Sequence, residues 1–559
     1  MTLQGLNFLD GIHVKIGTQP CDIRSINLKS CPQRITCQTR AQNAGKVPVI
    51  LTNPDTQSTS IANGFSFISG LSAPTQVANF FYYPNNPIQL TLGSTLPSGL
   101  YTPLPNPHFS PVPTPSSNPT IIDLTNFTTS PILPNGLQIN YASGEISGTP
   151  TETSPTQLYT IYTSSSSYQL TAQIFLGVSN FGTGLNQNLL VSSSNQIVNT
   201  YSAILSSTIS SGSISFKIQD PATGASSSFT PGDEILLIQM QNSAFDFASS
   251  NWEFAKILTV TPLSPGVVTI TTVSPILNYY SSLSSSLSSL STSASVSQII
   301  KIPQYQSIQV PLGQSITAVP WNGSIGGVLA FRSTGSVQID GAIHTNGKGF
   351  RGGIGQSLAN FGSTPLPSTQ PGESWNGTGS SETLTTGGGA GGAIIPGSSS
   401  GGSAAYGSNG ALPPSPIPGY FPSASGTLYG NSNLNLLFLG SGGGGSVQTT
   451  GCAAPSGGAG GGIILIYAKN VKVNGLLSSN GDHAKLDPGG CLGDVGGPGA
   501  GGSILLSSFI LDLGINRVTA QGGRGDWNYT GNGGSGRIRL NSPTIIGTTL
   551  PNAGFVSQP

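Results

Sequence analysis

Apolar and polar residues alternate in four stretches of the C-terminal half, and these stretches share one pattern. The first opens at Gly326-Gly327, continues with the apolar run 328–331 and the alternating run 337–343, and closes at Asn346-Gly347. The other copies open at Gly461-Gly462, at Gly501-Gly502 and, in shortened form, at Gly534-Ser535-Gly536. Alternation with period two between turn-forming Gly and Asn residues predicts short β-strands.

A single copy of this pattern cannot bury its own apolar side, so neighbouring copies must stack on one another. The repeat therefore predicts a glycine-rich parallel β-helix over residues 313–559. Two long insertions, 350–440 and 482–500, separate the copies and are expected to project from one flank. Their Gly runs, such as 387–392 and 457–462, either form flexible turns or pack as polyglycine-like strands, because only Gly permits so close a backbone approach.

The N-terminal segment, residues 1–72, reads as short strands and resembles the IPT/TIG family of immunoglobulin-like domains. The matching residues are Gly5-Leu-Asn-Phe-Leu-Asp-Gly11, Val14-Lys-Ile-Gly17, Ile35-Thr-Cys-Gln-Thr39, Val49-Ile-Leu-Thr-Asn-Pro-Asp55 and Asn63-Gly-Phe65. The family has a further strand before the Gly-x-Asn-Phe motif, where this sequence has only Met1 to Gln4. The first strand is therefore expected to be missing, either because the sequence was cut there or because a neighbouring subunit donates a strand.

A second motif lies in residues 73–180, for which a second immunoglobulin-like sandwich is predicted. Leu133-Pro-Asn-Gly-Leu137 and the run Gly144-Glu-Ile-Ser-Gly-Thr-Pro150 resemble the putative Ig repeat of bacterial surface proteins, LPxGLxxxxxxGxIxGTP. In such proteins these modules are stalks or spacers. Residues 181–312 follow as a β-rich block, so the predicted fold class is all-β throughout: two sandwiches, this block and the β-helix.

The composition excludes several classes of function. Charged residues make up 7% of the chain, against about 25% in ordinary globular proteins. Lys plus Arg equals Asp plus Glu at 19 each, so no net field favours nucleic acid. Apolar residues reach 36% and lie in strand-like runs, which argues against disorder. No window of eighteen apolar residues exists, so no membrane span is expected.

The five cysteines are spaced for disulfides rather than for zinc, since none forms a CxxC pair. Disulfides indicate an oxidising, extracellular compartment. We predict the pairs Cys21–Cys37 and Cys452–Cys491 and leave Cys31 unpaired, although the sequence does not fix the connectivity. No secretory signal is visible, so either it has been cleaved or the sequence is a fragment.

Acidic residues are too scattered to predict an enzyme. Carbohydrate-cleaving β-helices need paired carboxylates on consecutive strands, and no such pairing occurs in the sequence. The densest acidic cluster is Asp482, Asp487 and Asp494, in one Gly-rich loop. Carboxylate oxygens suit Ca²⁺, so this loop is the one candidate metal site, although its spacing matches no EF-hand; no other cofactor is expected.

Aromatic residues in the insertions are the candidate ligand contacts: Trp375, Tyr406, Tyr420, Phe421 and Tyr429. Such rings either stack on sugars or pin the insertions to the flank of the β-helix. The sequence thus predicts an extracellular, non-enzymatic surface protein, a stalk or fibre subunit that self-associates through sheet edges or contacts surface glycans. The alternatives are a carbohydrate-active β-helix enzyme and a monomeric glycan-binding adhesin.

Overall fold

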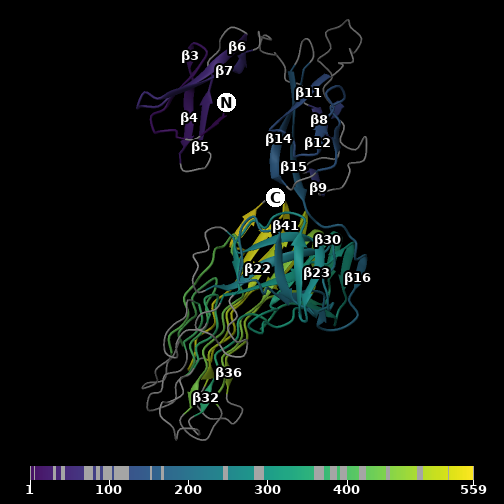
Figure 1. Cartoon of the computed structure of the whole chain (residues 1–559), viewed down its shortest axis with the longest axis vertical. Coiled ribbons are helices and arrows are strands. Elements are labelled where there is room, and N and C mark those ends of the chain that lie inside the picture. Colours follow the sequence, from purple (N-terminus) through teal and green to yellow (C-terminus); the bar gives the residue numbers. More distant parts are fainter. Residues whose placement is uncertain are drawn as a thin grey trace.

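The computed structural model shows an all-β chain (Figure 1). The structure describes residues 2–5, 7–28, 33–39, 45–67, 80–82, 88–91, 103–105, 125–150, 154–164, 169–242, 250–282, 295–357, 370–377, 387–390, 400–413, 423–448, 454–486, 495–526 and 528–557. None of these residues lies in a helix long and apolar enough to cross a membrane.

The N-terminal domain is a sandwich of two antiparallel sheets. The first has the order β1–β5–β4, which are Thr2–Gly5, Gln33–Gln38 and Asp22–Asn27. The second has the order β3–β2–β6–β7, which are Gln19–Pro20, His13–Ile16, Gly45–Thr52 and Ser58–Phe67. Thr2–Gly5 pairs antiparallel with β5 and forms one edge of the first sheet. The expectation that a further strand is missing before it stays a prediction.

The predicted disulfide between Cys21 and Cys37 is formed, with a Cα–Cα distance of 5.7 Å. Both residues belong to the buried core between the two sheets, beside Ile35 and Val49. Cys31, Cys452 and Cys491 lie outside the described residues, so their pairing stays a prediction.

The second module holds a four-stranded sheet in the order β11–β14–β15–β9, which are Thr125–Ser130, Ser154–Ser164, Gln169–Ser179 and Ile88–Thr91. Two further pairs are β8 with β10 and β12 with β13, which are Phe80–Tyr82, Pro103–Pro105, Leu137–Ile139 and Ile146–Gly148. The hairpin of β12 and β13 is built on the LPxGLxxxxxxGxIxGTP motif. Gly148, with φ 113°, is required there because a Cβ would overlap the carbonyl of Gly136.

The C-terminal half is a stack of parallel strands, and each turn of the stack is called a rung here. The rungs form three ladders, in which each strand pairs with its counterpart in the next rung. The first ladder holds β27, the first parts of β30 and β34, then β38, β40 and β42: Gln304–Tyr305, Val328–Ile339, Ile463–Val473, Ser503–Ser507, Arg537–Asn541 and Phe555–Ser557. The second ladder holds β16 (Asn188–Leu190), β28 (Ser307–Val310), the second parts of β30 and β34, then β39 (Ile510–Thr519) and β41 (Thr544–Leu550). The third ladder holds β17 (Gln196–Ile197), β29 (Ser315–Thr317), β31 (Ala342–His344), β35 (Leu476–Ser478) and the ends of β39 and β41.

The four predicted sequence copies stack in register, as expected. Leu329 pairs with Ile464, Ile464 with Ile504, and Ile504 with Ile538, and all four side chains are buried in one core. The glycines that open the copies also align, since the Ile463 N–H donates to the Gly327 carbonyl. The predicted all-β class and the glycine-rich parallel stack are therefore confirmed.

The stack begins earlier than residue 313, at β16, and residues 199–302 form an antiparallel sheet inserted after its first rung. The sheet order is β20–β24–β23–β22–β26–β18–β21, which are Ser215–Gln219, Val267–Thr272, Trp252–Ser264, Glu234–Asn242, Ser295–Lys301, Thr200–Ala203 and Thr223–Gly224. A small pair, β19 with β25, is Thr208–Ile209 and Tyr280–Ser281. Leu236 and Ile300 of this sheet pack against Ala330 and Leu465, on the outer face of the first ladder. Because these ladder strands are buried on both faces, their sequences are continuous apolar runs rather than alternating ones.

The glycine-rich insertions form a bundle of extended segments that continues from the rungs (Figure 1). Its short pairs are β32 with β33 and β36 with β37: Gln356–Ser357, Val447–Gln448, Lys485–Leu486 and Val495–Gly496. Most bundle hydrogen bonds lie outside these pairs and repeat every three residues. The N–H groups of Gly440, Gly443 and Ser446 donate to residues 461, 458 and 455, while their carbonyls accept from residues 350, 353 and 356. A repeat of three residues is that of a polyproline-type helix.

Segment 440–446 is buried along its whole length and bonds to six surrounding segments. These contain residues 350–356, 370–373, 389, 402, 455–461 and 497–500. At the glycines such contact leaves no room for a side chain: a Cβ at Gly443 would overlap the Gly497 carbonyl, and one at Gly442 the Arg351 carbonyl. Of the two alternatives for the Gly runs, the described segments adopt close polyglycine-like packing.

Candidate functional site

A groove crosses the corner where the second ladder turns into the third, and unequal turn lengths create it. In β30–β31 and β34–β35 the turn is two residues long, Asp340-Gly341 and Asn474-Gly475. In the flanking rungs the turns are longer, covering 311–314 and 513–517. The short turns therefore form a floor between two raised walls, which lie three rung spacings apart, roughly 14 Å.

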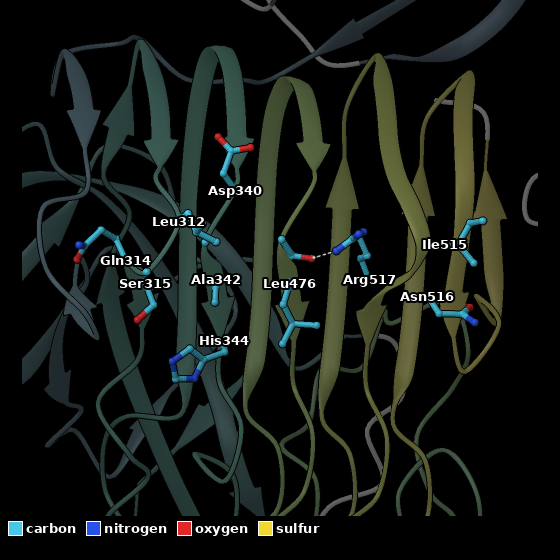
Figure 2. Close-up of a pocket in the computed structure, with 13 residues that line it drawn as sticks. Leu312, Gln314, Ser315, Asp340, Ala342, His344, Leu476, Ile515, Asn516 and Arg517 are labelled. Carbon is cyan, nitrogen blue, oxygen red and sulfur yellow. Dashed lines mark hydrogen bonds between the residues drawn. The ribbon is translucent and has the colours of Figure 1, made fainter.

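The floor is flat because glycine occupies the same place in both short turns. A Cβ at Gly341 would overlap the Gln314 carbonyl, and a Cβ at Gly475 would overlap the Gly341 carbonyl. The groove has a volume of about 700 Å³ (Figure 2). Leu312 on one wall is 85% exposed and Ile515 on the other is 79% exposed, so the walls present apolar side chains to an incoming molecule.

Asp340 is the carboxylate of this groove, and side-chain amides fix it. Its Oδ1 accepts hydrogen bonds from Asn474 Nδ2 at 2.8 Å and from Gln338 Nε2 at 2.9 Å. These two bonds, first that of Asn474, lower the pKa of Asp340, so it is held as an anion. Arg517 lies across the floor and donates to the Gly475 carbonyl at 3.3 Å (Figure 2).

His344 is the imidazole of the groove and is half-buried. Its Nε2 lies 2.9 Å from Asn195 Oδ1, and its buried Nδ1 has no hydrogen-bond partner among the described residues. Burial, and then the charge of Lys348, lower the pKa of His344, which favours the neutral ring. If Nε2 carries the proton and donates it to Asn195, Nδ1 is left as an unpaired acceptor.

The titratable side chains on this groove are Asp340, His344 and Arg517. One carboxylate held by amides does not make the acid and base pair that glycoside cleavage uses. Apolar walls with a few polar groups are typical of a binding surface. The sequence analysis did not predict this groove, although the contrast between two-residue turns and longer turns at one place in the repeat was a usable signal.

The candidate calcium loop is described only in part. The Asp482 carboxylate lies against Gly347 of the preceding rung, and its N–H donates to the Ala459 carbonyl at 2.8 Å. Asp487 and Asp494 lie outside the described residues. Within the described part of the chain, no three His, Cys, Asp or Glu side chains come together as a metal site. The calcium site stays a prediction.

Three of the candidate ligand-contact aromatics face the protein. Tyr406 is fully buried, Tyr429 is 7% exposed, and their ring centroids lie 4.9 Å apart. Trp375 is 6.0 Å from Phe438, and Tyr406 Oη lies 2.8 Å from Ser503 Oγ on β38. These contacts favour the interpretation that the rings pin the insertions to the β-helix. Tyr420 and Phe421 lie outside the described residues.

Comparisons with known proteins identify the N-terminal domain. The family model of the IPT/TIG domain matches residues 1–67, so an IPT/TIG domain forms the N-terminus. No curated protein matches the sequence.

Three solved structures match parts of the chain with low scores. Sidekick-1 immunoglobulin domains 1–4 are 13% identical over 49% of this chain and 64% of that one, with a TM-score of 0.11. A Bacteroides ovatus protein of a mixed-linkage glucan utilization locus, SGBP-B, is 10% identical over 53% of this chain and 69% of that one, with a TM-score of 0.14. The I-band fragment of titin is 9% identical over 48% of this chain and 77% of that one, with a TM-score of 0.11. Scores this low carry no argument about fold or function.

Proposed function

We propose that this chain is an extracellular structural and adhesive surface protein, acting as a stalk or fibre subunit. The proposal rests on one observation. The glycine bundle and the β-helix are both held together by backbone hydrogen bonds, and a single chain segment runs from one into the other. Gly461 accepts and donates bonds within the glycine bundle, and two residues later Ile463 begins the β34 ladder. A body bonded through its backbone in both parts resists bending, which is what a stalk or fibre needs.

Three further features support an extracellular surface protein. The IPT/TIG domain and the LPxGLxxxxxxGxIxGTP motif together resemble the modules of bacterial cell-surface proteins. The Cys21–Cys37 disulfide suits an oxidising compartment. In a chain with 7% charged residues the surface charge changes little with pH or salt, which lets like copies approach.

Self-association would use the ends of the stack. The last ladder strands that the structure describes, β41 and β42, each pair on one edge only. Ile546 is 55% exposed on β41 and Val556 is 55% exposed on β42. Unpaired N–H and C=O groups beside apolar side chains are a template for another strand. A head-to-tail contact of this kind produces an open filament.

The rival functions are a carbohydrate-active enzyme and a monomeric glycan-binding adhesin. The groove at Asp340 favours binding over cleavage, because that carboxylate is fixed by Asn474 and Gln338 rather than paired with a second acid. An adhesin is compatible with the stalk, since a binding groove can sit on a rigid body.

Negative-stain electron microscopy of the protein isolated from its source tests the proposal. Filaments with a constant axial repeat, or rods anchored at the cell surface, are the expected result. Antibody labelling of intact cells gives the location independently. A cytoplasmic protein, or one that cleaves polysaccharides at a useful rate, would overturn the proposal.

A further inference from the structure

A second groove, of about 670 Å³, lies on the flank of the glycine bundle. It forms where segments 480–484 and 521–524 run side by side. The Gly481 N–H donates to the Gln521 carbonyl at 2.9 Å, and the Ala484 N–H donates to the Arg524 carbonyl at 2.8 Å. Asn532 and Ser535, from the segment that leads into β40, complete one side. Backbone bonds therefore hold the side chains of this groove in fixed positions.

Three lining side chains accept hydrogen bonds from backbone N–H groups. Asn480 Oδ1 accepts from Gln521 N at 2.7 Å, His483 Nδ1 from Arg524 N at 2.8 Å, and Asn532 Oδ1 from Gly525 N at 2.9 Å. Among the described residues, Nδ2 of both asparagines and Nε2 of the histidine have no hydrogen-bond partner. When Nδ1 accepts a bond, Nε2 carries the proton. All three side chains thus keep N–H donors for another molecule.

Positive charge reinforces this set of donors. Arg524 is exposed on the groove, and the described residues give its guanidinium no ion-pair partner. The neighbouring acids do not line the groove: the Asp482 carboxylate lies against Gly347, and Asp526 Oδ1 accepts from Asn528 N at 3.0 Å. Three donors and one free guanidinium suit a ligand rich in acceptor oxygens that carries negative charge.

We propose that this groove binds an acidic saccharide, whose carboxylate or sulfate pairs with Arg524. The inference rests on the proposed surface function and deepens it by naming the ligand class. The hydroxyls of Ser408 and Ser535, on the same lining, form a hydrogen bond with each other at 3.1 Å and add a polar edge to the groove. A volume of about 670 Å³ holds a saccharide rather than a single ion.

Isothermal titration calorimetry on the full chain at low salt tests the site. The probes are trigalacturonate, a sulfated galactotriose, neutral galactotriose and inorganic sulfate. We expect the two acidic trisaccharides to bind, the neutral one to bind at least about tenfold more weakly, and the acidic affinity to fall as NaCl rises. Comparing the affinity of trigalacturonate, which carries carboxylates, with that of the sulfated galactotriose shows which charged group the groove binds more tightly.

Two variants locate the binding. Arg524→Gln removes the charge without removing any described side-chain hydrogen bond, and it should weaken trigalacturonate at least about tenfold. His483→Asn keeps an acceptor for the Arg524 N–H but loses the Nε2 donor, so a several-fold loss is expected. Arg34→Gln, on an exposed strand position of the IPT/TIG domain, makes the same charge change far away in sequence and should leave affinity unchanged.

Equal binding of acidic and neutral trisaccharides, or an unchanged affinity in Arg524→Gln, would overturn the proposal. So would binding of inorganic sulfate as tight as that of the trisaccharides, which would identify a simple anion site. None of these outcomes affects the filament and localisation tests, so failure of this site remains distinguishable from failure of the stalk function.

Discussion

Glu373 binds Arg351 through both carboxylate oxygens, with Nε–Oε2 at 2.9 Å and Nη2–Oε1 at 3.1 Å. The carboxylate is only 3% exposed. It also accepts from Trp321 Nε1 at 3.2 Å and from Gln241 Nε2 at 3.0 Å. Gln241 belongs to the inserted antiparallel sheet, Trp321 to the approach to β30, and Arg351 to the glycine bundle. One buried carboxylate therefore joins three parts of the chain.

Replacing Glu373 with alanine should destabilise this junction by about 3 kcal/mol, because the buried N–H donors of Trp321 and Gln241 lose their acceptor and the partly exposed Arg351 guanidinium loses its partner. Trp321 packs on Phe350 with ring centroids 6.0 Å apart, so its fluorescence should report the loss. The measurement is urea unfolding followed by tryptophan emission.

The control for this variant is Asp10→Asn, at an exposed position of the N-terminal domain, which should shift the same transition by less than about 0.5 kcal/mol. Equal effects of Glu373→Ala and Asp10→Asn would contradict the idea that Glu373 is a shared anchor.

Gly443→Ala should disrupt the bundle. The added Cβ would overlap the Gly497 carbonyl, and the neighbour is backbone rather than a movable side chain. We expect a loss of about 3 kcal/mol or more, at the upper end of overpacking effects. Hydrogen exchange of the segments around residues 440–446 should accelerate, while exchange in the IPT/TIG domain stays unchanged.

Gly313→Ala provides the matched control for the glycine substitution. Its φ is 81° and nothing lies within 4 Å of the added Cβ, so only backbone strain of about 1–2 kcal/mol is introduced. If Gly443→Ala proved no worse than Gly313→Ala, close packing of the bundle would not be what stabilises it.

Local pattern in the sequence was sufficient to predict the stacking but not the outer layer. Leu329 and Ile464 pair because both occupy the same place after a Gly pair, and that spacing is readable in the sequence. Ala330 and Leu465 lie on the outer face of the first ladder, but in the sequence they cannot be told from the residues of the inner core. No local pattern predicts that Leu236, more than ninety residues earlier, packs against them.

The grooves were missed because they arise from differences between copies, whereas repeat analysis looks for what copies share. Leu312 and Ile515 stand in turns that are longer than those at Gly341 and Gly475. The bundle was foreseen only as one alternative, because glycine composition favours flexibility and close packing equally. Long-range hydrogen bonds, such as Gly443 to Gly458, decide between the two.

Arg332→Lys should weaken the attachment of the inserted sheet to the β-helix. Arg332 is 3% exposed and binds Glu234 through Nε at 2.7 Å and Nη2 at 2.9 Å. Its guanidinium also lies 4.3 Å from the Phe254 ring and 4.7 Å from the Tyr467 ring. Lysine cannot form both bonds or stack, so a loss of about 2–3 kcal/mol is expected in chemical unfolding.

A double-mutant cycle isolates the Arg332–Glu234 interaction. Arg332→Met and Glu234→Gln should each destabilise the protein, while the double variant should cost clearly less than the two single losses combined. Additive losses would show that the two side chains do not depend on each other.

Acid should destabilise the third ladder through His344. Its folded pKa lies below the ordinary 6.5, first because of burial and then because of Lys348. Between the folded and the unfolded pKa the unfolded chain binds more protons, so stability falls as the pH drops below about 6.5 and is level above it.

Thermal unfolding of His344→Gln should show a smaller loss of stability than the native protein over that pH window. Lys348→Met should reduce the acid sensitivity in part, since it removes the second cause while leaving the ring buried. An identical pH dependence in the native protein and His344→Gln would assign the acid response to other groups.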